Sequence, residues 1–219
     1  MRRILVFLFL SSLRLIARTF WRLDRSFVGD TRPETAFGGL RLVAVLNHTS
    51  LFDWLLIGAV PHAFLWRLAT HGVVPAAQKT TRRPLVGWFF RMLGQHVVEI
   101  TRERDSSWRA VLQRIDPDSM VIIAPEGRMK RPNGLDSHGQ PMTVRGGIAD
   151  ILEAIPEGPM LLAYSGGLHH VQAPGERYPR LFRTIRLAIE RVDIAEYRAA
   201  RLAEAGSQIG FKRAVVADL

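Results

Sequence analysis

The chain has 219 residues, no cysteine and a formal net charge of +10 at pH 7. This length suits one α/β domain with a sizeable buried core. The absence of cysteine excludes disulfides, thiol nucleophiles and cysteine metal sites. The positive charge indicates anionic partners, a class that includes nucleic acid, acidic lipid headgroups and phosphorylated substrates.

The chain begins with a basic pair, and a short apolar run follows at residues 4–10. This run is too short for a membrane-spanning helix, which needs about 20 mostly apolar residues. Four arginines then recur at helical spacing, opposite apolar residues: Arg14, Arg18, Arg22 and Arg25. The pattern predicts an amphipathic helix in a membrane interface, with an ordinary surface helix and a cleaved secretory signal as alternatives. We therefore assign residues 1–28 to a membrane-interface helix and residues 29–219 to the α/β domain.

An apolar run at residues 40–46 predicts a strand that delivers Asn47 and His48, and Asp53 follows the histidine by five positions. Histidine exchanges a proton near neutral pH, and a carboxylate on its other ring nitrogen fixes its tautomer. Within one regular helix these side chains would lie about 140° apart and could not meet. They can meet if His48 lies in the turn after the strand and Asp53 in the first turn of a following helix. The alternative is two unrelated polar residues at a loop-to-helix junction.

The rest of the chain alternates helices and strands. Through its middle we expect helix 51–60, strand 64–69, turn 72–75, helix 84–93, strand 97–102, helix 106–115 and strand 120–124. Beyond them we expect helix 145–155, strands 158–164 and 182–192, helix 194–205 and a frayed tail. The fully apolar run at 120–124 is typical of a strand buried in a parallel or mixed sheet.

Pro125, Glu126, Gly127 and Arg128 follow this buried strand at its carboxyl end, where open α/β sheets place their ligands. Gly127 would let the backbone approach a substrate closely, and Glu126 could accept a hydrogen bond from a hydroxyl or an amide. The alternative for Glu126 is a loop carboxylate paired with a neighbouring arginine.

These two segments resemble the motifs of the glycerolipid acyltransferase family, which includes the lysophosphatidic acid acyltransferases. The residues that match its Asn-His-x-Ser-x-x-Asp motif are Asn47, His48, Ser50 and Asp53. Residues 122–128 resemble its strand followed by Pro-Glu-Gly-Thr-Arg, although Arg128 stands one place early and Met129 occupies the usual arginine position. The resemblance covers residues 40–164. It implies an α/β domain with a central mixed, largely parallel sheet flanked by helices.

The resemblance also implies a reaction, in which an acyl group moves from a thioester of coenzyme A or acyl carrier protein to the hydroxyl of a lysophospholipid-like acceptor. His48 would remove the hydroxyl proton, and Asp53 would stabilise the imidazolium that forms. Backbone N–H groups or Asn47 would stabilise the negative charge that develops on the carbonyl oxygen. We expect no metal and no cofactor besides the acyl donor. The expected partners are membrane lipids, the donor and the acceptor, with no nucleic acid, at the cytoplasmic face of a bacterial inner membrane.

Arginines and a lysine are candidates for the anionic part of the substrates, because a guanidinium pairs bidentately with phosphate. The family has an arginine after the strand predicted at 97–102, where Arg102 or Arg104 stands; the alternative is a solvated charge run. The shift of Arg128 by one place leaves three possibilities. Arg128 could reach the phosphate from a shifted backbone, or Lys130 or Arg131 could take its role. In the third, the acceptor carries no phosphate at this position. The substrate-binding candidates are Asn47, Ser50, Arg102, Glu126, Gly127, Arg128 and Lys130.

Other functional classes stay open at this point. The shifted Arg128 favours an acyltransferase that acts on a non-glycerophosphate hydroxy or amino lipid. A non-enzymatic basic protein that binds membrane or nucleic acid would also explain the charge. The adjacent His169 and His170 do not form a metal pair if they lie on a strand, because neighbouring residues then point to opposite faces. A Gly-x-Ser-x-Gly nucleophile elbow is absent from the sequence.

Overall fold

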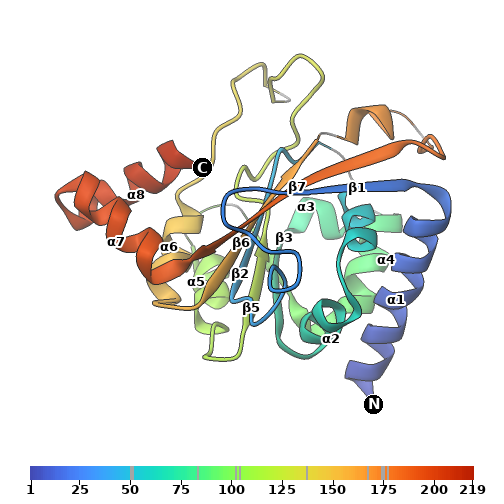
Figure 1. The fold of residues 1–219 in the computed structure, drawn as a ribbon, viewed down its shortest axis with the longest axis horizontal. Coiled ribbons are helices and arrows are strands. Elements are labelled where there is room, and N and C mark those ends of the chain that lie inside the picture. The colour runs from blue at the N-terminus through green and yellow to red at the C-terminus, as the bar shows by residue number, and fades with distance from the viewer. Residues whose placement is uncertain are drawn as a thin grey trace.

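A seven-stranded sheet forms the centre of the computed structural model, with the strand order β1-β7-β6-β2-β5-β3-β4 (Figure 1). The structure describes residues 1–49, 52–82, 84–101, 103, 105–136, 138–166, 168–173, 176 and 178–219, without the side chains of 84–86 and 208. The strands are β1 (Arg22–Phe27), β2 (Leu42–Leu46), β3 (Gly72–Ala77), β4 (Val97–Ile100), β5 (Met120–Ile123), β6 (Pro159–Ser165) and β7 (Thr184–Asp193). Neighbouring strands pair in parallel except β6 and β7, which are antiparallel. The predicted mixed, largely parallel sheet is confirmed.

Helices cover both faces of this sheet, with η marking 3-10 helices. They are α1 (Arg2–Phe20), η1 (Asp53–Ala59), α2 (His62–His71), α3 (Gln78–Thr81), α4 (Pro84–Leu93), η2 (Gly94–His96), α5 (Ser106–Gln113), α6 (Gly147–Ala154), η3 (Leu168–His170), α7 (Ile194–Ala205) and α8 (Gln208–Asp218). In Figure 1, α1, α2 and α4 lie on one side of the sheet and α5 to α8 on the other.

Two hydrophobic cores result, because successive residues of a strand point to opposite faces. Val43 of β2 joins the core beneath α1, η1 and α2, whereas its neighbours Leu42 and Ala44 join the core beneath α5, α6, α7 and α8. Both faces of β2 are therefore buried, as expected for an apolar strand in the middle of a largely parallel sheet. Because both faces of β2 are buried, its carboxyl end, which leads into the candidate site, is held in place.

Three predicted elements are wrong. Residues 64–69 belong to α2 and not to a strand, and the buried residues Phe64, Leu65 and Leu68 lie on one face of that helix. The predicted turn at 72–75 is the start of β3, whose residues Gly72 and Val73 pair with β5. The tail forms α8 instead of fraying, because Phe211 and Val215, four residues apart, are both buried against the core.

The predicted helix at residues 1–28 ends earlier. α1 stops at Phe20, and residues 22–27 form β1, an edge strand paired in parallel with β7. The buried residues of α1 are Val6, Leu10 and Ala17. Besides Phe20 at its end, its exposed large apolar residues lie on the opposite side: Ile4, Leu5, Leu8, Leu15 and Ile16. The helix thus packs on the domain through one apolar face and exposes a second one.

The four arginines predicted to form one polar helix face do not lie on one helix. Arg14 donates a hydrogen bond from Nε to the carbonyl oxygen of Val60 at 2.7 Å, and Arg22 and Arg25 lie on β1. Within the described part of the chain, no helix has both the length and the apolar character required to cross a bilayer.

Gly58 lets η1 pack closely against α1 and β1. A Cβ atom at this position would lie 3.0 Å from Ala17 Cβ and 2.4 Å from Leu23 Cδ1. We expect Gly58→Ala to lower the free energy of unfolding by about 1–3 kcal/mol, because α1 and β1 must shift to make room. Urea denaturation measures the change. Gly38→Ala is the control, since a Cβ there would lie 3.6 Å from its nearest neighbour, the Thr35 oxygen; an equal loss in both variants would contradict the prediction.

Candidate active site

His48 and Asp53 meet at the carboxyl end of β2. His48 lies in the turn after the strand, Asp53 is the first residue of η1, and Nδ1 of the imidazole is hydrogen-bonded to Oδ2 of the carboxylate. The side chains are 24% and 14% exposed, respectively. Oδ1 of Asp53 is buried, with no hydrogen-bond partner among the described residues. The predicted arrangement, with the histidine in the turn and the aspartate in the first helical turn, is therefore the observed one.

The 3-10 helix η1 begins without a side-chain cap. The N-cap of η1 is Phe52, with no side-chain cap hydrogen bond, and Thr49 Oγ1 accepts a hydrogen bond from the backbone N–H of Leu168 at 2.7 Å. Ser50 lies outside the described residues. Thr49 thus joins the turn after β2 to η3, which follows the neighbouring strand β6.

The imidazole–carboxylate contact has a direct chemical consequence. When Nδ1 donates to a carboxylate, Nε2 becomes the basic nitrogen, and the carboxylate stabilises the ring after it takes up a proton. The pair can therefore serve as a general base at the carboxyl edge of the sheet. Open α/β sheets bind their ligands at this edge.

Glu126 supports the histidine through the backbone. Its Oε1 accepts from the N–H of Asn47 at 3.0 Å, and its Oε2 accepts from the N–H of His48 at 2.9 Å. Asn47 has φ +60°, a left-handed conformation that is uncommon outside glycine. Glu126 is only 8% exposed, and this burial raises the pKa of its carboxyl group, against the opposing effect of the two amides. Both oxygens of Glu126 therefore bind the turn that carries His48, in place of the alternative, a pairing with a neighbouring arginine.

Lys130 also binds the turn that carries His48. Its backbone N–H donates to the carbonyl oxygen of His48 at 2.8 Å, and its own carbonyl oxygen is 2.7 Å from Nε2 of His169. The Lys130 charge is near enough to Glu126 to lower the pKa of that carboxyl group. Of the cationic candidates, Lys130 thus has its backbone beside His48, and its contact with the substrate stays a prediction.

Arg128 pairs with Asp136, whose side chain is 2% exposed. Asp136 also accepts hydrogen bonds from the backbone N–H groups of His138 at 2.7 Å and Gln140 at 3.0 Å. The Gln140 amide and the Arg128 guanidinium hold the pKa of Asp136 at about 2, well below its usual range. The charge of Arg128 is therefore compensated within its own loop.

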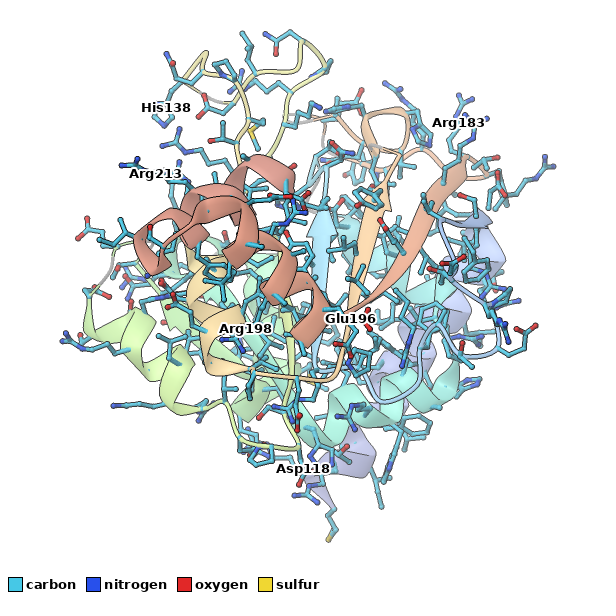
Figure 2. All side chains as sticks on the ribbon, turned by 60° about the vertical axis from the view of Figure 1, so that its left-hand side comes forward. Asp118, His138, Arg183, Glu196, Arg198 and Arg213 are labelled. Atoms are coloured by element: carbon cyan, nitrogen blue, oxygen red, sulfur yellow. The ribbon has the colours of Figure 1, made fainter. Side chains whose placement is uncertain are left out.

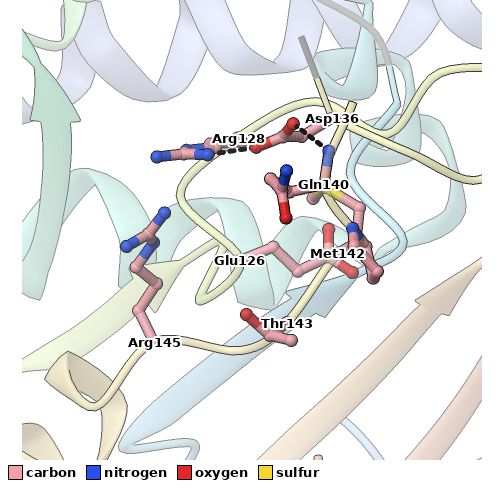
Figure 3. A pocket seen from close by; sticks show the side chains of 8 residues that line it. Glu126, Arg128, Asp136, Gln140, Met142, Thr143 and Arg145 are labelled. Atoms are coloured by element: carbon pink, nitrogen blue, oxygen red, sulfur yellow. Dashed lines mark hydrogen bonds and ion pairs between the residues drawn. The ribbon is translucent and has the colours of Figure 1, made fainter. Parts of the chain in front are cut away.

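A cavity of about 330 Å³ lies beside Glu126 and is shown in Figure 3. Its lining residues are Glu126, Arg128, Asp136, Gln140, Pro141, Met142, Thr143 and Arg145. In Figure 3, Arg128 reaches across to Asp136, whereas Arg145 extends along another side of the cavity. Sequence reasoning did not include Arg145 among the site residues; its only signal was a basic residue directly before Gly146 and Gly147.

Gly127 sits between Glu126 and Arg128 with φ +65°, a conformation that disfavours side chains. A Cβ there would meet Arg145 Cγ at 3.8 Å, an ordinary contact. We expect Gly127→Ala to lower the free energy of unfolding by about 1–2 kcal/mol through backbone strain alone. Chemical denaturation measures this loss, again with Gly38→Ala as control. An unchanged midpoint would show that the turn relaxes without cost.

The remaining predicted positions are not all visible. Arg102 and Arg104 lie outside the described residues; Thr101, just before them, lines a cavity of about 240 Å³ at the ends of β3 and β4. His169 and His170 lie on η3, not on a strand, and their Nε2 atoms are hydrogen-bonded to carbonyl oxygens of Lys130 and Thr184. The described residues contain no group of three or more His, Asp or Glu side chains that could hold a metal ion.

The fold and the paired His48 and Asp53 define an α/β protein with a candidate enzyme site at its sheet edge. The model of the family described as Acyltransferase matches residues 28–163, so the chain belongs to the acyltransferase family. Among solved structures, the crystal structure of the 1-acyl-sn-glycerophosphate (LPA) acyltransferase PlsC from Thermotoga maritima is similar in fold. The TM-score is 0.56 at 20% sequence identity, over 95% of this chain and 77% of that chain. A search of curated proteins finds no match.

Proposed function

We propose that this acyltransferase moves a fatty acyl group from an acyl thioester to the hydroxyl of a lysophospholipid-like acceptor. The observation that carries the proposal is the contact between His48 and Asp53, in a chain of the acyltransferase family. His48 removes the hydroxyl proton while the oxygen attacks the thioester carbonyl, and Asp53 stabilises the imidazolium. The tetrahedral intermediate then expels the thiolate of coenzyme A or acyl carrier protein. The thiolate takes the proton back from His48.

The negative charge on the carbonyl oxygen needs hydrogen-bond donors. Glu126 already engages the backbone N–H groups of Asn47 and His48. We therefore assign this task to the side-chain amide of Asn47 and to the N–H groups of Asp53 and Trp54 at the start of η1, because the next N–H, that of Leu55, already donates to the carbonyl oxygen of Phe52 at 2.8 Å. Ser50, from the same motif, is a further candidate contact to the substrate.

Cations near the site suggest where an anionic acceptor group binds. Lys130 lies beside the histidine turn, and the exposed Arg145 lines the cavity next to Glu126. The Arg102 position follows the end of β4 and is the third candidate. An anionic headgroup held by Lys130 and Arg145 would place the acceptor hydroxyl at the sheet edge that carries His48.

A second candidate function follows from Arg128. Its ion pair with the buried Asp136 leaves it less able to bind a phosphate than the arginine of the family motif. This favours an acyltransferase of the same fold that acts on a hydroxy or amino lipid without a glycerophosphate group. The same general base would serve either acceptor.

We also propose that the protein docks on a membrane, at the cytoplasmic face of a bacterial inner membrane. The exposed apolar face of α1 is extended by two exposed tryptophans, Trp66 on α2 and Trp88 on α4. Ring contacts join them to α1, with centroid distances of 5.5 Å from Trp66 to Phe7 and 5.4 Å from Trp88 to Phe9. Apolar helix faces with aromatic residues are typical of interfacial membrane binding.

The test is acyl transfer from a radiolabelled acyl thioester to a panel of lysophospholipids and of phosphate-free hydroxy and amino lipids. Parallel reactions with acyl-coenzyme A and acyl carrier protein identify the donor. Transfer to a phosphorylated acceptor that is lost in His48→Ala supports the first function. Transfer only to phosphate-free acceptors selects the second. No transfer to any acceptor with either donor contradicts both.

A further inference from the structure

A second exposed apolar group lies far from the N-terminus of α1. In the connection from β6 to β7, Tyr178 is 69% exposed, Phe182 is 67% exposed, and Leu181 is also exposed. Phe182 has φ +58°, which is rare for a bulky residue and costs on the order of 1 kcal/mol. Because the Phe182 ring is exposed, its burial within the domain does not offset the cost of this backbone conformation. Such a combination indicates a contact with something outside it.

The segment 178–183 is fixed to the end of α1. The N–H of Phe182 donates to the carbonyl oxygen of Phe20 at 2.7 Å, and Nε1 of Trp21 donates to the carbonyl oxygen of Arg180 at 2.9 Å. The rings of Phe20 and Phe182 lie with their centroids 6.3 Å apart. Figure 1 shows the start of β7 and the end of α1 at the same edge of the molecule. The aromatic group therefore adjoins the end of α1 at Phe20.

Positive charge surrounds these apolar residues. Residues 18–22 and 178–183 contain four arginines and no acidic residue: Arg18, Arg22, Arg180 and Arg183. All four are exposed, and only Arg180 forms an ion pair among the described residues, with Glu176. In Figure 2, Arg183 points away from the body of the protein. Aromatic side chains flanked by arginine match the headgroup region of an anionic bilayer.

The same connection also reaches the active site. At its start, Leu168 and His169 are hydrogen-bonded to Thr49 and Lys130, which flank His48. Further along, the N–H of Arg180 donates to the carbonyl oxygen of Val171 at 2.7 Å. A contact made by residues 178–183 would thus lie on the chain segment that supports the histidine turn.

We propose that residues 178–183 and the end of α1 form a second membrane contact, which inserts Leu181 and Phe182 among the headgroups of an anionic phospholipid bilayer. The inference rests on the proposed membrane docking and adds an orientation to it, with the edge that carries His48 held at the lipid surface. α1, about 28 Å long from its 19 residues, exposes apolar residues from Ile4 to Phe20. An apolar face of this length favours a bilayer over an acidic carrier protein.

The absence of cysteine makes site-specific labelling direct. Phe182→Cys, Leu8→Cys on α1 and Ile209→Cys on α8 are each labelled with an environment-sensitive nitrobenzoxadiazole dye. The control position Ile209 is 82% exposed and lies on the opposite side of the sheet from α1 (Figure 1). With phosphatidylcholine vesicles that contain half phosphatidylglycerol, we expect a several-fold rise and a blue shift at positions 8 and 182, and no change at 209.

Each other outcome has a separate meaning. A rise at position 8 without one at 182 overturns the second contact and leaves α1 docking intact. No rise at either position overturns the membrane docking itself. A rise at 182 with acyl carrier protein, but not with vesicles, assigns the segment to a protein partner and also overturns the proposal.

Charge and insertion can be separated with two further variants. Arg183→Gln is expected to weaken binding to the anionic vesicles about fivefold, while Arg213→Gln, an exposed arginine on α8, leaves it unchanged. The double variant Leu181→Ser with Phe182→Ser is expected to weaken vesicle binding about tenfold. Its transfer to a water-soluble short-chain acceptor should stay at the wild-type rate. Equal vesicle binding by wild type and the double variant would overturn the insertion.

Discussion

Replacing His48 by alanine is expected to lower the turnover of acyl transfer by about 10²–10⁴-fold, the usual contribution of a general base. The imidazole is bound to Asp53 through Nδ1, so the variant loses both the proton acceptor and the group that the carboxylate stabilises. Because proton removal belongs to the transition state, turnover should fall with little change in the KM for the acceptor. Initial rates at several acceptor concentrations measure both quantities.

His138→Ala is the matched control, because this histidine is exposed on the neighbouring loop and its backbone N–H keeps its hydrogen bond to Asp136. It should keep the wild-type rate. Asp53→Asn preserves the size of the side chain but cannot stabilise an imidazolium in the same way, so a large loss is expected there too. Turnover within threefold of wild type in His48→Ala would rule out the histidine base.

The local arrangement of His48 and Asp53 was predictable because it depends on few contacts. The apolar strand, the turn and a helix that begins at the aspartate are each encoded within 14 residues, and a spacing of five positions excludes a single helix. The neighbouring segment that ends at Glu126 was also predictable, since it follows an apolar strand. What could not be predicted was that both carboxylate oxygens bind the backbone of the histidine turn. That depends on β2 and β5 being adjacent in the sheet.

The errors lie where a pattern has two interpretations. Residues 64–69 form a short apolar run, and such runs do not distinguish a strand from a buried helix. In α1, apolar residues occur on both faces, so the sequence alone could not decide which face packs on the domain. Gly58 favours the face that carries Ala17, because a Cβ on η1 at this position would lie only 3.0 Å from Ala17 Cβ. The Arg128 pair with Asp136 depends on how a polar loop folds back, for which composition carries no signal.

The second large effect is expected at Glu126. Glu126→Ala leaves the half-buried N–H groups of Asn47 and His48 without their acceptor, at up to about 1–3 kcal/mol for each donor. It also removes the support for the left-handed Asn47. We expect a loss of several kcal/mol in unfolding free energy, and about 10²-fold in turnover if the histidine is displaced by about 1 Å. Glu126→Gln keeps one acceptor and should fall between wild type and the alanine variant.

The pH dependence of stability gives an independent test of this burial. Since burial raises the folded-state pKa of Glu126 above its ordinary value of 4.5, its favourable contribution is complete below that value and is lost as pH rises through the raised pKa. The unfolding free energy of wild type minus that of Glu126→Gln should therefore decrease from pH 4.5 upward and become constant above the raised pKa. Denaturation curves between about pH 4 and pH 8 measure this. An increasing difference would mean that the two amides outweigh burial.

The kinetics of Glu126→Gln distinguish a positioning residue from a substrate ligand. Both Glu126 oxygens are already bound to backbone N–H groups, so its replacement should act through the placement of His48. A displaced base slows the chemical step and lowers turnover, whereas a lost acceptor contact raises KM. We therefore expect turnover to fall with the KM for the acceptor within about twofold of wild type. A higher KM at unchanged turnover would instead place Glu126 on the acceptor, as the sequence first suggested.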